Sequence, residues 1–144
     1  MSALFLIVRL AGERVAIRAA QVESVVEIGE VIPVPGAAAH VAGLAALRSR
    51  VVTVIDCAVS LRAGAPAPVR AAAVVTLDGH AYALLVDGVE DVVEASGEPR
   101  PLPGAVGGEW GRIARAAVEV QGDLLLLVDV APLVAGVEPG SRAA

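Results

Sequence analysis

The feature that most constrains the fold of this chain is an internal repeat. Gly12 and Gly79 each follow an apolar segment, and they stand 67 positions apart. Further along, Asp56 and Asp129 each end an apolar segment at a spacing of 73, because the second half carries a longer loop. Matches that occur in the same order in both halves are not explained by composition. We interpret them as an internal duplication, which predicts two similar folding units.

Each half is predicted to form a small β unit with Gly and Pro turns. Short strands joined in this way favour small closed barrels over an open sheet. Residues 41–50, between the Pro-rich segment and the strongest strand of the first half, are interpreted as a loop that carries Gly43 and ends in a polar turn. The predicted strands are residues 4–10, 15–17, a segment through 25–26, and 51–55 in the first half, then 72–77, 82–86, a segment through 92–93, and 124–128 in the second.

Two aspartates are predicted to begin short helical turns. Asp56 and Asp129 each precede a brief apolar segment, residues 57–61 and 130–134. A carboxylate at the N-cap accepts a hydrogen bond from a free backbone N–H of the first turn. The fold class expected is therefore all-β in the main, with short helical turns.

Composition excludes several classes of function. The net charge is −5 and the chain has only three aromatic residues, whereas nucleic-acid binding needs a basic surface and often stacking platforms. The single cysteine, Cys57, excludes an internal disulfide and a Cys-based metal cluster. Following a buried strand, Cys57 is interpreted as a small packed hydrophobe.

The apolar content of 56% raises the question of a membrane protein. The longest uncharged run, residues 31–47, contains Pro33, Pro35, Gly36 and Gly43, which do not fit a continuous spanning helix. The N-terminal apolar run has neither a basic flank nor a cleavage signal. We therefore expect a soluble, cytoplasmic protein.

No catalytic, cofactor-binding or metal-binding residues are predicted. His40 and His80 have no carboxylate at ligand spacing, and no known catalytic motif is present. Ser49, His40 and Asp56 could in principle meet as a hydrolase triad, since such triads need no sequence adjacency, but nothing in their spacing favours it. A sensor with a small ligand pocket between the two units is a further alternative.

Recognition of other proteins is the function that the residues favour. A domain of this size has a limited interior, so some of its Val, Leu and Ala side chains must lie on the surface. Exposed apolar surface framed by charges such as Glu23, Arg48 and Arg50 is typical of a protein–protein interface. Arg48 has a structural alternative, which is an ion pair with Glu23.

From about residue 4 to residue 134, the chain resembles CheW, the bacterial chemotaxis coupling protein, and the CheW-like regulatory domain of the CheA histidine kinase. The family's Asn-Leu-Arg-Gly turn, followed by a strand that ends in Asp, is similar to residues 46–49 and 51–56. Its Val-Asp-x-Val-x-Asp-Val segment is similar to residues 86–92. The resemblance implies one CheW-like domain, residues 1–144, made of two five-stranded SH3-like β-barrel subdomains that share a core. We place these subdomains at about residues 4–61 and 71–134, followed by a flexible tail, residues 135–144.

The resemblance also implies a non-catalytic adaptor without cofactors. Such a protein would couple transmembrane chemoreceptors to a CheA-type histidine kinase, binding the regulatory domain of the kinase and the cytoplasmic tip of the receptor. It would be cytoplasmic and recruited to membrane receptor arrays, without nucleic acid and without inserting into the membrane. A second chemosensory system, such as one for surface motility, is the alternative, and a small serine hydrolase is a more distant one.

The partner-binding residues that the resemblance implies centre on Arg48, which matches the family's signature arginine. Ser49 replaces the glycine that follows this arginine, so a turn that needs a positive φ would be strained or reshaped here. Ser24 stands where many members have a carboxylate, with Glu23 adjacent. The expected set is Arg48, Ser49, Val22, Glu23, Gly43, Val89 and Val92.

Overall fold

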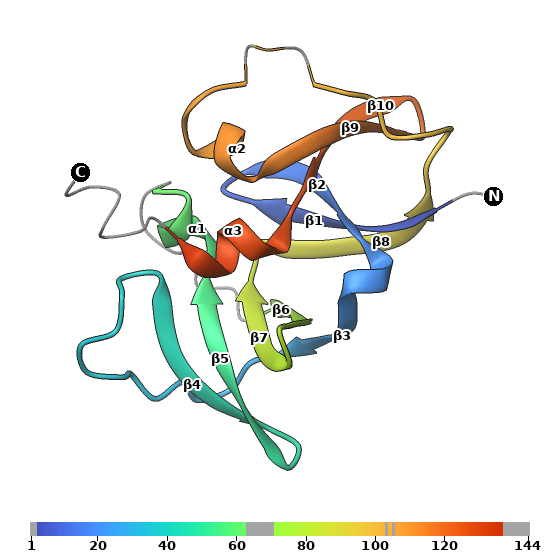
Figure 1. Ribbon diagram of the computed structural model, residues 1–144. Coiled ribbons are helices and arrows are strands. Elements are labelled where there is room, and N and C mark those ends of the chain that lie inside the picture. Colours follow the sequence, from blue (N-terminus) through green and yellow to red (C-terminus); the bar gives the residue numbers. More distant parts are fainter. Residues whose placement is uncertain (1–2, 63–70, 103, 105, 137–144) are drawn as a thin grey trace.

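The computed structural model describes residues 3–62, 71–102, 104 and 106–136, and these form two five-stranded β-sheets with short helices at their junction (Figure 1). The strands are β1 (Leu4–Leu10), β2 (Glu13–Arg18), β3 (Val22–Glu27), β4 (Val41–Leu47), β5 (Arg50–Asp56), β6 (Ala71–Leu77), β7 (His80–Leu85), β8 (Gly88–Glu94), β9 (Ala114–Val120) and β10 (Asp123–Val128). The helices are the 3-10 turn η1 (Ala19–Gln21), α1 (Cys57–Ser60), α2 (Gly108–Ile113) and α3 (Val130–Ala135). The predicted all-β fold with short helical turns is confirmed.

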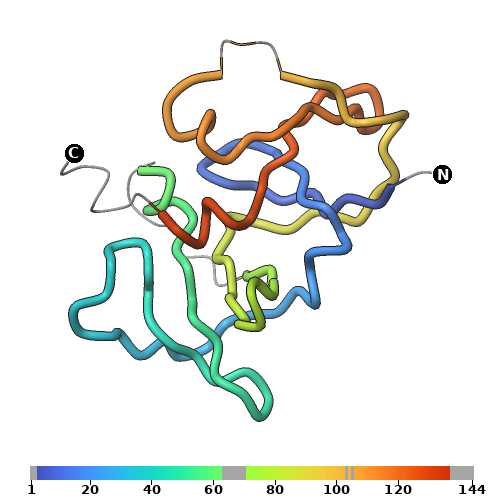
Figure 2. The backbone as a smooth tube through the Cα atoms, viewed as in Figure 1, coloured from blue at the N-terminus to red at the C-terminus, as the bar shows by residue number. Residues whose placement is uncertain are grey.

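Each sheet takes strands from both halves of the chain. The first sheet has the order β8-β1-β2-β10-β9, and the second has the order β3-β6-β7-β5-β4. Figure 2 shows the N-terminal hairpin in the upper sheet continuing down into β3 of the lower one. The expected subdomains, residues 4–61 and 71–134, therefore do not coincide with the sheets. The opening hairpin of each half pairs with the last three strands of the other half, a long-range exchange that local patterns do not record.

The two halves nevertheless have the same topology, which agrees with the duplication. Replacing each strand of one sheet by its counterpart five strands away gives the order of the other sheet. The last strand of each half also makes the only parallel pairing among the described strands of its sheet, β5 with β7 and β10 with β2. Isolated bridges recur at matching places, Ile32 with Leu44 and Arg100 with Ala117. The repeat in the sequence is thus a repeat of structure.

Two-residue turns connect most of the hairpins. Glycine is the second residue in three of them, Ala11-Gly12, Asp78-Gly79 and Gln121-Gly122, and both residues of each turn have a positive φ. This pattern matches the right-handed twist of the flanking strands, and glycine adopts it without steric cost. The β4–β5 turn differs, because Arg48 has a φ of +58° whereas Ser49 does not have a positive φ. The replacement of glycine by Ser49 is thus accommodated by a different turn shape.

A common core lies between the two sheets. In β1, Leu6, Val8 and Leu10 contact this core, while Phe5 and Ile7 pack into a second cluster on the other face of the first sheet. Successive side chains of a strand point to opposite faces, so a strand buried on both faces is apolar throughout. The common core also contains residues of the second sheet, such as Ile55, Ala73, Val75 and Leu84. The expectation of two units sharing one core is confirmed.

Two strands were not predicted, and the predicted closure of the barrels differs from the structure. Residues 41–47, expected to be a loop, form β4, and β9 occupies a segment that was left unassigned. Both are rich in alanine, which is depleted in strands, so pairing with β5 and β10 rather than local propensity decides their conformation. Among the described residues neither sheet closes by backbone pairing, since β3 and β4 are the edges of the second sheet and β8 and β9 those of the first.

The predicted helix caps are confirmed. Asp56 Oδ1 accepts a hydrogen bond from the Val59 backbone N–H at the start of α1, and Asp129 Oδ1 accepts one from Ala131 at the start of α3. Asp56 is the last residue of β5 and Asp129 directly follows β10, so each closing strand turns directly into a helix. The caps place α1 and α3 side by side at the junction of the sheets (Figure 1).

Arg112 of α2 joins the three helices at this junction. Its guanidinium donates to the backbone oxygens of Ser60 in α1 (2.8 Å) and Pro132 in α3 (2.6 Å), and its Nε donates to Glu109 (3.0 Å). Carbonyls near the C-terminal end of a helix lack partners within the helix, and a cation satisfies them well. Arg112 is therefore a clamp between elements of both halves.

Two further expectations concern the ends of the chain and its helices. The predicted flexible tail, residues 135–144, lies outside the described residues except for Ala135, which ends α3, and Gly136. None of the helices in the described part of the chain combines the length and the apolar character needed to cross a membrane.

Candidate interaction surface

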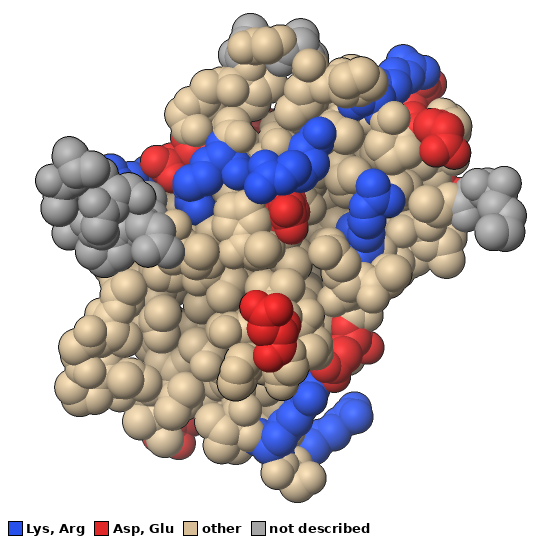
Figure 3. Space-filling model, viewed as in Figure 1, with Lys and Arg blue, Asp and Glu red and all other residues tan. Residues whose placement is uncertain are grey.

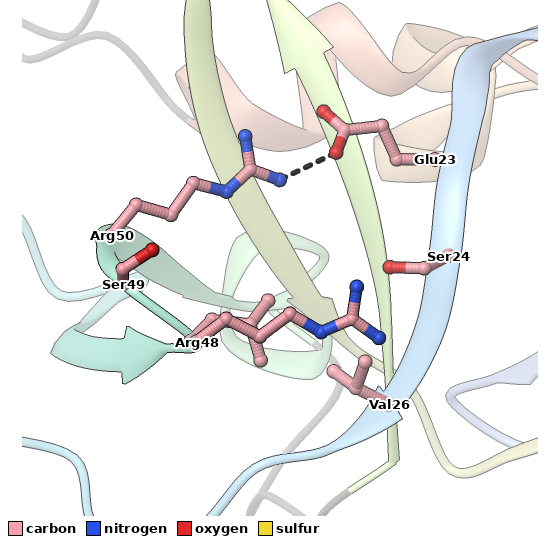
Figure 4. Close-up of a pocket in the computed structure, with 7 residues that line it drawn as sticks. Glu23, Ser24, Val26, Arg48, Ser49 and Arg50 are labelled. Atoms are coloured by element: carbon pink, nitrogen blue, oxygen red, sulfur yellow. Dashed lines mark hydrogen bonds and ion pairs between the residues drawn. The ribbon is translucent and has the colours of Figure 1, made fainter.

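A hollow opens at the corner where the β4–β5 hairpin faces β3. It has a volume of about 370 Å³ and brings together three of the predicted residues, Glu23, Arg48 and Ser49 (Figure 4). The remaining lining residues are Ser24, Val26, Leu47 and Arg50. β3 and β4 are opposite edges of the second sheet, so this sheet must curl until its edges approach each other. The seam is joined by side chains, which gives the sheet a barrel-like shape without backbone closure.

An ion pair crosses this seam. Arg50 Nη2 donates to Glu23 Oε1, and the Thr76 hydroxyl donates to Glu23 Oε2. The hydrogen bond from Thr76 and the Arg50 guanidinium lower the pKa of Glu23 below its ordinary value, because both stabilise the ionised carboxylate. The expected alternative for Arg48, an ion pair with Glu23, is wrong, since Arg50 reaches that carboxylate instead.

Arg48 projects from the tip of the hairpin into the hollow. Figure 4 shows its guanidinium directed toward Ser24 and Val26 of β3. The side chain is exposed and makes no hydrogen bond or ion pair with any described residue. In Figure 3, basic groups lie at the hairpin tip, with acidic groups just above them and an uncharged part of the surface to their left. The corner therefore presents a cation that the fold itself does not neutralise.

Apolar surface adjoins this corner on the outer side of β4 and β5. Val51 is 65% exposed and Ile32 is 61% exposed. Both line a second hollow of about 310 Å³, together with Gly29, Glu30, Leu44, Ala45 and Ala46. Large apolar side chains exposed at neighbouring positions are typical of a surface that contacts another protein. The alternation along β5 could have identified Val51, because Val52 and Val54 are buried on the opposite face.

Gly43 supports this apolar surface from below. It lies at a bulge in β4 with a φ of +147°, and a Cβ there would overlap the backbone carbonyl of Ile32. The absence of a side chain lets the Ile32 segment pass close to β4 and form its bridge to Leu44. Gly43 is thus buried beneath the surface and holds Ile32 in its exposed position.

The valines of the predicted set lie elsewhere. Val22 in β3 and Val89 in β8 occupy equivalent places in the two halves, and both pack partly against the common core. Val92, on the edge strand β8 of the first sheet, is 48% exposed. The structure therefore groups Glu23, Arg48 and Ser49, with Gly43 close by on β4, and separates Val89 and Val92 from them. Ile32, Val51 and Thr76 are residues of this corner that the sequence analysis did not identify.

The alternative hydrolase triad does not assemble. Ser49 precedes the first residue of β5 and Asp56 is its last, so the whole strand separates them. The Asp56 carboxylate caps α1, and His40 Nε2 is 2.8 Å from the backbone oxygen of Val134. Each side chain serves its own local structure. Cys57 is buried and free, and burial raises the pKa of its thiol, which agrees with its interpretation as a packed hydrophobe.

Fold and surface together define a class of protein: two packed β-sheets with exposed apolar side chains near their strand edges. The family model for the CheW-like domain matches residues 4–138, and the chain belongs to this family. The expectation of a non-catalytic protein agrees with this membership.

A solved structure has the same fold. The scaffolding protein TtCheW from Thermoanaerobacter tengcongensis matches with a TM-score of 0.82 and 18% sequence identity, over 92% of each chain. At this identity the likeness concerns the fold. Among curated proteins no significant match was found.

Proposed function

We propose that this protein is an adaptor that couples transmembrane chemoreceptors to a CheA-type histidine kinase. The observation that supports this most strongly is the corner of the second sheet, where exposed Ile32 and Val51 adjoin the unneutralised Arg48. Membership of the CheW-like family agrees with it. The partners are the regulatory domain of the kinase and the cytoplasmic tip of the receptor. The protein acts in the cytoplasm, where receptor arrays at the membrane recruit it.

The size and character of the corner fit a transient interface. Signalling interfaces of this kind bury roughly 1,200 Å² or somewhat more, and apolar contacts with a few charges give micromolar affinity. Val51 and Ile32 supply the apolar part, and the charged hairpin tip forms one rim. Simultaneous binding of several partners in an array then raises the effective affinity without new contacts.

Reconstitution tests the proposal. Receptors in vesicles and the purified kinase, taken from the organism that encodes this protein, are assayed for kinase autophosphorylation with and without it. We expect receptor control of the kinase only when the protein is present, and micromolar binding to each partner alone. The proposal is wrong if the receptor controls the kinase equally well without this protein, or if the protein binds neither partner.

Two matched substitutions, one in each sheet, identify the surface that each partner contacts in the same assay. Val51→Asp places a charge in the apolar surface of the second sheet, and its exposure means that the fold should tolerate it. We expect weaker binding to at least one partner. Leu124→Asp is the matched substitution, since Leu124 is 64% exposed at the equivalent place in the first sheet. Comparing the two variants shows which corner meets which partner.

A further inference from the structure

We infer that the hollow between β3 and the β4–β5 hairpin accepts a carboxylate, and that Arg48 binds an Asp or Glu side chain of the partner protein there. The inference rests on the proposed function, because it names the chemistry that a partner brings to this corner. It predicts that binding includes a buried charge pair and is not apolar contact alone.

The first argument is that the acid already present in the hollow is fully engaged. Glu23 uses one oxygen for Arg50 and the other for Thr76. Its charge is therefore neutralised without Arg48, whose side chain has no partner among the described residues. A guanidinium has five N–H donors in a planar fork that matches a carboxylate in two parallel hydrogen bonds. Arg48 retains all of this capacity for an external acid.

The second argument is the backbone conformation at Arg48. A φ of +58° is unfavourable for a residue with a side chain, and glycine is preferred at the first position of a turn with this pattern. Ala11, Asp78 and Gln121 have a similar positive φ at the first position of their turns, but each is followed by a glycine with a positive φ, whereas Arg48 is followed by Ser49. The strain is thus shared by the four described hairpin tips, and what distinguishes Arg48 is the turn shape that Ser49 gives. Here it directs the guanidinium across the seam toward β3.

The third argument is the lining of the hollow around the guanidinium. Ser24 lies on β3 opposite Arg48, and Figure 4 shows its hydroxyl directed toward the arginine side chain. A serine hydroxyl can donate to a carboxylate oxygen but cannot neutralise a guanidinium. With a volume of about 370 Å³, the hollow admits a carboxylate side chain beside both groups. Val26 lines the same hollow and places an apolar side chain beside these groups.

The distribution of charge on the protein favours an acidic partner segment at this hollow. The chain has a net charge of −5, so an acidic partner segment is not attracted to the protein as a whole. The hairpin tip is a local exception with two arginines, of which one is neutralised by Glu23. Complementary charges of this kind determine the orientation of a complex and its rate of association. An acidic side chain would thus align the partner so that its apolar surface meets Val51 and Ile32.

Titration calorimetry of the full-length protein with the kinase regulatory domain, and separately with the receptor cytoplasmic fragment, tests the inference. We expect Arg48→Met to weaken binding of one partner by about tenfold or more and to reduce its salt dependence. Ser24→Glu places a carboxylate inside the hollow, where it competes for Arg48, and should weaken the same partner. Arg100→Met is the charge-matched control, because Arg100 is an exposed arginine on the first sheet, paired with Glu119, and should bind as wild type.

Charge reversal on both proteins is the decisive experiment. Arg48→Glu should abolish binding of that partner, and one Asp or Glu to Lys substitution on the partner should restore it. Thermal unfolding of each variant verifies that the fold is intact. If Arg48→Met binds both partners with wild-type affinity and salt dependence, the inference is wrong while the proposed function stands. If the wild-type protein binds neither partner, the proposed function fails, and the inference fails with it.

Discussion

Each sheet has a corner where its third-strand acid, Glu23 or Glu90, lies. The two corners are related by the duplication, but different arginines neutralise the two acids. In the second sheet Glu23 pairs with Arg50 of β5 and accepts a hydrogen bond from Thr76. In the first sheet the equivalent acid, Glu90, pairs with Arg14 of β2 and lies 3.5 Å from Arg9. Both corners keep an acid on the third strand of a half, while the cations come from different strands.

The difference extends to the hairpin tips. Arg14 also pairs with Asp123, which stands where the second sheet has Arg50. The tip of the β9–β10 hairpin is then Gln121-Gly122, which is uncharged, whereas the β4–β5 tip is Arg48-Ser49. An exposed apolar residue is retained at both corners, Val51 and Leu124. Both corners thus keep an exposed apolar residue, whereas only the β4–β5 tip carries a cation.

The largest expected effect comes from Gly43→Ala. Its counterpart in the other half is Ala116, which pairs next to the equivalent bulge. At Gly43 an added Cβ would overlap the Ile32 carbonyl, so we expect the free energy of unfolding to fall by about 2–3 kcal/mol. Denaturant unfolding measures it. Ala116→Gly is the control, with a loss of about 1 kcal/mol or less; an equal loss in both variants would show that the bulges are interchangeable.

A somewhat smaller effect is expected for Arg112→Met. Helix α2 lies between β8 and β9 in the second half, whereas no helix lies among the described residues between β3 and β4 in the first half. Removing the guanidinium leaves the carbonyls of Ser60 and Pro132 without this donor, which should lower the free energy of unfolding by about 2 kcal/mol. Chemical denaturation compares it with Arg115→Met, whose exposed side chain should matter less. Equal free energies of unfolding for the two variants would show that Arg112 does not act as a clamp.

Arg48→Gly makes the two hairpin tips more alike and should raise stability slightly. Glycine relieves the unfavourable φ of +58°, so we expect a gain of about 0.5–1 kcal/mol together with weaker partner binding. Thermal unfolding and titration calorimetry on the same sample measure the two effects. A loss of stability would mean that the Arg48 side chain supports the fold.

The smallest effect concerns the pH dependence of the seam. Because the pKa of Glu23 is lowered in the folded protein, its contribution to stability is present above the ordinary value of 4.5 and is lost as the pH falls through the lower folded value. Glu23→Gln removes this contribution. The stability difference between wild type and variant should therefore shrink on acidification, as measured by denaturant unfolding at neutral and acidic pH. A difference that is independent of pH would contradict the role of the ion pair.

Local features were predictable from the sequence. The hairpins with glycine turns, the helix caps at Asp56 and Asp129, and the repeat itself depend on neighbouring residues, so short patterns record them. The resemblance to the CheW-like family added the five-stranded form of each unit and the importance of Arg48. For the site, the family pattern and the charge pattern pointed to Glu23, Arg48 and Ser49, and the structure places these three residues around one hollow.

Tertiary structure alone decided which strands share a sheet and which arginine stays free. The parallel pairings of β5 with β7 and β10 with β2 join segments far apart in the chain, and they draw alanine-rich β4 and β9 into the sheets against their local propensity. The same curling brings Arg50 to Glu23 and leaves Arg48 without an ion pair among the described residues. Charge in the sequence shows that arginines are present, but the distance between strand edges determines which of them is neutralised.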